Sequence, residues 1–150
     1  WKAAAEHLMS IAERDLGAAL ADMNKVDEDQ QLRFLIRSYV QFCAKHPELN
    51  RLMIQEGMAR DWRLSWLIKR AVRPWYEQVC RVFKRAAELG VAPKMDAHHF
   101  YYVLTGAATL IFSNAAEAAA LSSENPLAPK AVDTHANAVA DSLTLNRRPL

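Results

Sequence analysis

The sequence predicts an all-α fold, a bundle of about six helices in one domain of 150 residues. Three observations support this class. Glycine occurs only four times, no stretch shows the period-two alternation of β-branched residues that strands require, and apolar residues recur every three or four positions along most of the chain. A chain of this length is long enough to bury one core of ordinary size.

Composition supports a globular protein and excludes several other classes. Hydrophobic residues make up 51% of the chain, charged residues 24%, and the net charge is +2, which argues against disorder and against a nucleic-acid-binding arm. Cys43 and Cys80 lie within apolar helical patterns, so we expect reduced core thiols in a cytoplasmic protein. The chain begins at Trp1 without an initiator methionine, which predicts a piece of a longer protein.

The first four helices are predicted at residues 2–23, 29–45, 47–57 and 62–72. The first two carry apolar residues in steps of three and four, and the acidic stretch VDEDQQ between them supplies the start of the second. Pro47 ends the second helix and opens the third, because its fixed φ suits a first helical turn. Gly57 closes the third helix, and Asp61 is placed to cap the fourth.

The last three helices are predicted at residues 74–89, 96–121 and 129–145. Pro74 interrupts the preceding pattern, so a separate helix is expected from that position. Gly90 is well placed as the C-terminal cap of this helix, and Asp96 as the N-cap of the next. After the loop SSENPLAP, Pro129 starts the last helix.

The helix predicted at 96–121 lacks a polar face. Residues 98–121 read HHFYYVLTGAATLIFSNAAEAAAL, and the first charged side chain is Glu117. One stripe contains Phe100 and Leu104 and another contains Tyr101 and Phe112, yet one small domain has no second layer to cover both. With two histidines, a glycine and several polar residues in the run, we expect it to be buried in protein and not in a membrane.

We therefore predict a homodimer in which the last two long helices of each chain form an intermolecular four-helix bundle. The alternative is that the two-faced helix is the central buried rod of a monomer. The predicted interface residues are Ala108, Phe112, Ala119, Val132, His135, Val139 and Leu143.

No catalytic, metal-binding or cofactor motif occurs, so we expect no enzyme activity, no metal and no cofactor. His98 and His99 are neighbours and would point about 100° apart on a helix, whereas shared ligation favours spacings of three or four. The chain contains no Glu-x-x-His pair of the di-iron type, no serine-centred elbow and no phosphate loop.

Aromatic and methionine residues concentrate in the middle of the chain, near Pro74. Such residues at helical spacing form either plain core or the lining of a hydrophobic ligand pocket, and the sequence leaves both open. Arg37 is a further nearby polar group that could orient a ligand. The predicted ligand-binding residues are Met53, Met58, Trp62, Trp66, Arg70, Trp75, Tyr76, Phe83, Tyr101, Thr105 and Thr109.

Several segments resemble the C-terminal regulatory domain of TetR-family transcriptional regulators. They are YVQFCAKHPELNRLMIQEG, RLSWLIKRAVRPWYEQV, AELG followed by Pro93 and Asp96, LTGAATLIF, NPLAP and HANAVADSLTLN. Their order and spacing extend over almost the whole chain. The resemblance implies a homodimeric four-helix bundle made by the last two long helices, and a mostly apolar effector pocket among the middle helices.

The resemblance also implies the function. We expect the effector-sensing and dimerisation domain of a TetR-like repressor, with a small hydrophobic or aromatic ligand as effector. The family's N-terminal helix-turn-helix is not in this sequence, so operator DNA is expected as a partner only through that absent unit. The alternatives are a helical small-molecule carrier or enzyme unrelated to transcription, and a plain helical interaction module.

Overall fold

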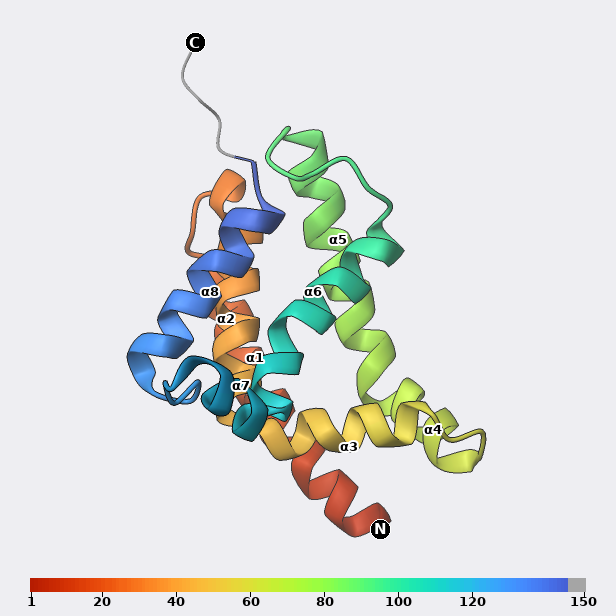
Figure 1. Ribbon diagram of the computed structural model, residues 1–150. Helices are drawn as coiled ribbons and strands as arrows, with labels where there is room; N and C mark the ends of the chain where they lie inside the picture. The colour runs from red at the N-terminus through yellow and green to blue at the C-terminus, as the bar shows by residue number, and fades with distance from the viewer. Residues whose placement is uncertain (146–150) are drawn as a thin grey trace.

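The computed structural model describes residues 1–145, and all regular elements in that range are helical (Figure 1). This confirms the predicted all-α class. The elements are α1 (Lys2–Met23), the 3₁₀ turn η1 (Glu28–Gln30), α2 (Gln31–Lys45), α3 (Pro47–Gly57), α4 (Trp62–Leu67), the π-helical turn η2 (Ile68–Val72), α5 (Arg73–Glu88), α6 (Ala97–Ser113), α7 (Ala115–Ser122) and α8 (Pro129–Leu143).

Helix α2 is the centre of the fold, because α1, α3, α5, α6 and α8 all pack against it. Leu32, Ile36, Val40 and Cys43 recur every three or four residues and are almost completely buried, as an amphipathic helix facing a core requires. Burial raises the pKa of the Cys43 thiol to about 12. One hydrophobic cluster joins these side chains to the buried residues of the surrounding helices.

The predicted N-terminal caps are confirmed. The Asp61 carboxylate accepts the backbone N–H of Arg63 at 2.8 Å at the start of α4. In the same way, Asp96 accepts the N–H of His98 at 2.8 Å at the start of α6. Pro47 is the first residue of α3, as expected. Each cap satisfies an N–H that has no partner within its own helix.

Gly90 ends α5 in the predicted position. Its φ is +73°, a left-handed conformation that costs glycine little and other residues more. The N–H of Val91 donates to the carbonyl of Ala86 at 2.9 Å, and that of Gly90 donates to Ala87 at 3.0 Å. These two bonds form a Schellman motif, which turns the chain toward α6.

Pro74 widens the helix before it instead of separating two helices by a loop. A proline has no N–H to offer the carbonyl four residues earlier, and its ring crowds that oxygen. The chain forms the π-helical turn η2 immediately before Pro74, where the N–H of Arg73 bonds to the carbonyl of Ile68. Helix α4, η2 and α5 therefore follow one another without an intervening loop.

The prediction of one continuous helix over residues 96–121 was wrong. Helix α6 ends at Ser113, α7 begins at Ala115, and the two are bent by 76°. Asn114 lies between them with φ −108° and ψ 37°. Serine and asparagine are weak helix formers because their side chains compete for backbone groups, and here they are adjacent.

The break leaves α6 with one buried face and one exposed apolar face. Phe100, Leu104, Ala108 and Phe112 are fully buried in the chain's own core. On the opposite side, Tyr102, Val103 and Leu110 are exposed. No helix in the described part of the chain is by itself long and apolar enough to span a membrane, although α6 and α7 pass that test together despite their bend.

Candidate binding site

The predicted ligand-binding residues fall into two clusters and a scattered remainder. The first cluster, which we call the Trp1 clasp, contains the predicted residues Trp62 and Trp66. It also contains Trp1, Glu56 and Arg63, which were not predicted. The Trp1 ring meets Trp62 and Trp66 edge-on, with centroids 5.4 and 5.7 Å away. Its Nε1–H donates to the buried carboxylate of Glu56 at 2.9 Å. The clasp joins the beginning of α1 to α3 and α4.

The second cluster lies where α2, α5 and α6 meet. Trp75 packs against Tyr39 at 4.9 Å, and Tyr76 packs edge-on against Tyr101 at 5.0 Å. The Thr105 hydroxyl donates to the carbonyl of Tyr101 at 2.7 Å. Burial raises the pKa of Tyr101 to about 12 and that of Tyr39 well above its ordinary value, so both phenols stay neutral.

The remaining predicted residues are not brought together. Met53 packs against the core from a half-buried position, whereas Met58 is exposed. Phe83 lies inside the core, and the hydroxyl of Thr109 donates to a carbonyl of its own helix at 2.8 Å. Arg70 is on the surface. A pocket lined by all the predicted residues is therefore not formed in this conformation.

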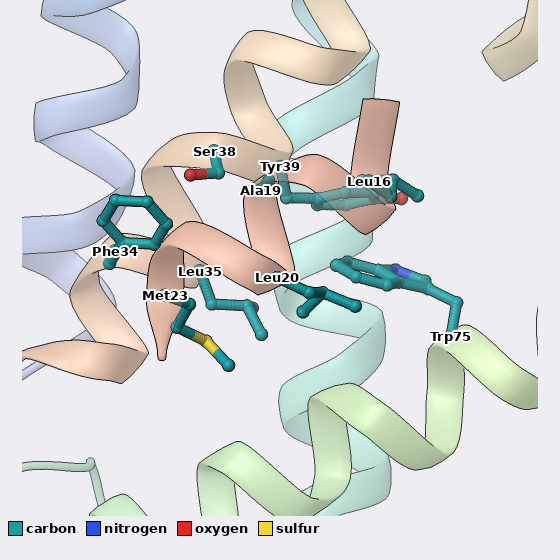
Figure 2. A pocket seen from close by; sticks show the side chains of 9 residues that line it. All are labelled: Leu16, Ala19, Leu20, Met23, Phe34, Leu35, Ser38, Tyr39 and Trp75. Atoms are coloured by element: carbon teal, nitrogen blue, oxygen red, sulfur yellow. The ribbon is translucent and has the colours of Figure 1, made fainter. Parts of the chain in front are cut away.

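A small cavity lies between α1, α2 and α5 (Figure 2). Its volume is about 10 Å³, room for about one water molecule. Of the predicted residues, only Trp75 lines it, and Figure 2 shows its indole extending from α5 toward Leu20 and Tyr39. The full lining is Leu16, Ala19, Leu20, Met23, Phe34, Leu35, Ser38, Tyr39 and Trp75.

Sequence reasoning missed the contribution of α1 to this cavity. Leu16, Ala19 and Met23 belong to an apolar face that is typical of any core helix, and no polar or glycine signal sets them apart. Phe34 lies on the solvent-facing side of α2, where the helical period predicts exposure, yet it is half-buried and lines the cavity. The Trp75 Nε1 atom is buried and has no hydrogen-bond partner among residues 1–145.

Ion pairs hold α1 in place beside the cavity. Asp15 accepts a hydrogen bond from Lys45 Nζ at 2.7 Å and contacts His46 Nε2 at 2.9 Å. These hydrogen bonds, that from Lys45 first, hold the pKa of Asp15 well below its ordinary value. Glu13 pairs with Arg70 on η2, which lowers the pKa of Glu13. Both ties lie immediately before the part of α1 that lines the cavity.

The predicted interface residues are mostly covered by their own chain. Ala108, Phe112, Val139 and Leu143 are buried, and Ala119, Val132 and His135 are half-buried. His135 Nε2 lies 2.8 Å from the carbonyl oxygen of Ala107, which fixes α8 against α6. The homodimer stays a prediction, and the apolar surface available for it on α6 is the exposed stripe of Tyr102, Val103 and Leu110.

Within residues 1–145, no three His, Cys, Asp or Glu side chains are grouped closely enough to hold a metal ion. The charged groups near the cavity, Glu13 and Asp15, are instead engaged in the ion pairs of α1. The cavity itself is lined by apolar side chains together with Ser38, Tyr39 and Trp75. This lining is suited to binding a neutral, largely apolar molecule and offers no acid–base pair.

One comparison with known proteins gives a match. The family model described as "Tetracyclin repressor-like, C-terminal domain" matches residues 29–143, a range that includes α2 to α8. No curated protein and no solved structure matches the sequence.

Proposed function

The chain belongs to the tetracycline repressor-like C-terminal domain family, and on that basis we propose that it senses a small, largely apolar effector as a homodimer. In this role the chain is part of a transcriptional repressor that binds DNA through an N-terminal helix-turn-helix. The effector controls that DNA binding. Domains of this family are regulatory and generally not enzymes.

The buried N–H of Trp75 is the observation that carries this proposal. An unpaired buried donor costs about 1–3 kcal/mol, and the side chain of Trp75 lines a cavity whose other walls are almost entirely apolar. An effector with a neutral hydrogen-bond acceptor on an aromatic or aliphatic body would satisfy this donor and fill the space. Because no charged side chain lines the cavity, a charged effector would be disfavoured there.

Helix α1 is the proposed moving part. A cavity of about 10 Å³ admits no organic molecule, so an effector must displace the wall formed by Leu16, Leu20 and Met23. The ion pairs of Glu13 and Asp15 would then be the point about which α1 turns, because they lie next to that wall. Displacing α1 would change the position of the DNA-binding unit, provided that the effector binds the displaced state more tightly.

The exposed face of α6 is the proposed dimer contact. Tyr102, Val103 and Leu110 form an uncharged stripe, and Gly106 between them has open space above it. Small residues at such a position allow two helices to approach closely. An obligate interface of this kind buries about 2,000 Å² or more, so α7 and α8 are expected to contribute as well.

Calorimetric titration with acetophenone, a neutral aromatic ketone, tests the sensing site. Trp75→Phe keeps an aromatic ring but removes the donor, so we expect binding to weaken by about three- to tenfold, the value of one hydrogen bond. Trp62→Phe is the matched control, because Trp62 lies in the Trp1 clasp away from the cavity, and should bind acetophenone like the original chain.

Equal losses in the two tryptophan variants, or no binding of acetophenone by the original chain, would count against this site. Native mass spectrometry of the same samples tests the second half of the proposal. It should show a dimer, and a monomer at micromolar concentration would refute the proposed assembly independently of ligand binding.

A further inference from the structure

A second depression lies on the solvent-facing side of α2, with a volume of about 550 Å³. This is within the usual size range of small-molecule sites, about 300–1,000 Å³. Apart from Val26, its lining residues recur every three or four positions and so share one face of the helix. They are Val26, Gln30, Arg33, Phe34, Arg37, Ser38 and Gln41. We call this depression the α2 groove.

The α2 groove is distinct from the cavity proposed for the effector, although they share a wall. Phe34 and Ser38 line both, and Figure 2 shows them on the side of the cavity opposite Trp75. The cavity has no charged side chain, whereas the groove has Arg33 and Arg37. The two sites therefore select different ligands.

Arg37 is the one arginine of the groove that is left without a counter-ion. Arg33 is paired with Asp141 on α8 at 2.6 Å, and Gln41 donates to Asp133 at 3.2 Å. Arg37 has no ion pair among residues 1–145, and its Nε atom is buried without a hydrogen-bond partner. Because Nε is shielded, the terminal N–H groups of the Arg37 guanidinium are the donors left for an acceptor bound in the groove.

We propose that the α2 groove binds a monocarboxylate with a flat apolar body. The planar guanidinium of Arg37 matches a carboxylate, which can accept two parallel N–H donors. Phe34 supplies the surface for the apolar body, and the amide of Gln30 lies at the rim. The acids that already engage Arg33 and Gln41 make the rim unfavourable for a multiply charged anion, so a single negative charge is the expected limit.

The test uses naphthalene-2-carboxylate as the probe and naphthalene-2-carboxamide as its neutral counterpart, titrated calorimetrically into the whole chain. The carboxylate should bind at least about tenfold more tightly than the amide, as expected for a charge-assisted hydrogen bond. Arg37→Met should remove that preference. Arg51→Met, which removes an exposed arginine from α3, should preserve it.

Two further variants keep the result interpretable. Arg37→Lys retains the charge without the planar fork, so carboxylate affinity should fall between those of the original chain and Arg37→Met. Trp75→Phe changes the cavity and not the groove, so it should leave carboxylate binding unchanged. This outcome separates failure at the groove from failure of the proposed effector site.

Amide chemical-shift changes on adding the carboxylate should centre on residues 30–41 of the chain. Equal affinity for carboxylate and carboxamide would overturn the proposal. So would a loss in Arg51→Met equal to that in Arg37→Met, or shifts confined to the residues around Trp75.

Discussion

Replacement of Leu110 by aspartate is the most direct test of the assembly proposed for α6. Fully burying a leucine side chain is worth about 1.5–3 kcal/mol. Leu110 is 60% exposed in the single chain, so the part that a partner could cover is worth about 0.9–1.8 kcal/mol, and twofold symmetry counts it twice. The expected loss is about 2–4 kcal/mol, or a dissociation constant raised by about 30- to 700-fold.

Burial of the new carboxylate adds to this loss, so the figure is a lower bound. Sedimentation equilibrium over a range of protein concentrations measures the dissociation constant. Ile54→Asp places the same charge at an exposed apolar site on α3 and should leave the dimer intact. Ala108→Asp should instead unfold the chain, because Ala108 is fully buried in its own core. An undisturbed dimer in Leu110→Asp would refute the assignment of this face.

Three further outcomes follow from local structure. Gly90→Ala should lower the free energy of unfolding by about 1 kcal/mol, because φ is positive at this position. Gly17→Ala within α1 should raise it by up to about 1 kcal/mol. Both sites have open space for a methyl group, and urea titration measures both changes. The depressed pKa of Asp15, due first to Lys45, contributes stability that is present above its unfolded pKa, near 4, and lost as the pH falls toward its lower folded value. The urea midpoint should therefore fall less on acidification in Asp15→Asn than in the original chain. With its pKa raised to about 12, Cys43 should be only about one part in 10,000 thiolate at pH 8 and should react with an aromatic disulfide reagent only after unfolding.

The fold was predictable because its boundaries depend on local chemistry. Pro47, Asp61, Gly90 and Asp96 act through φ, a missing N–H or a carboxylate acceptor, all of which can be inferred from the residue type and its position. The helix break at Asn114 was not predicted. One asparagine after a serine disfavours a helix by less free energy than tertiary packing can contribute in favour of it. The bend there is 76°, and α7 beyond it contributes no buried residue to the core.

The candidate sites were less predictable because each depends on which apolar helix faces pack against one another. Trp75 was predicted and lines the cavity, but its partners on α1 carry no feature that distinguishes them from ordinary core. On α6, Ala108 and Leu110 are only two residues apart, and hydropathy favours burying both. The packing of α2, α3, α5 and α8 against α6 determines that the alanine is buried and the leucine exposed.

Phe34 and Ser38 line both the cavity and the α2 groove, so we expect this shared wall to couple the two proposed sites. A ligand that fixes Phe34 from one side changes the space available on the other, and linkage requires the effect to be reciprocal. Acetophenone at saturation should therefore change the affinity for naphthalene-2-carboxylate by the same factor as the reverse, about fivefold or more in line with typical couplings. Phe34→Ala removes the shared ring and should bring the factor close to one, whereas Val26→Ala, which alters only the groove, should preserve it. A factor close to one in the original chain would refute the coupling, because linkage makes the two factors equal whatever their size.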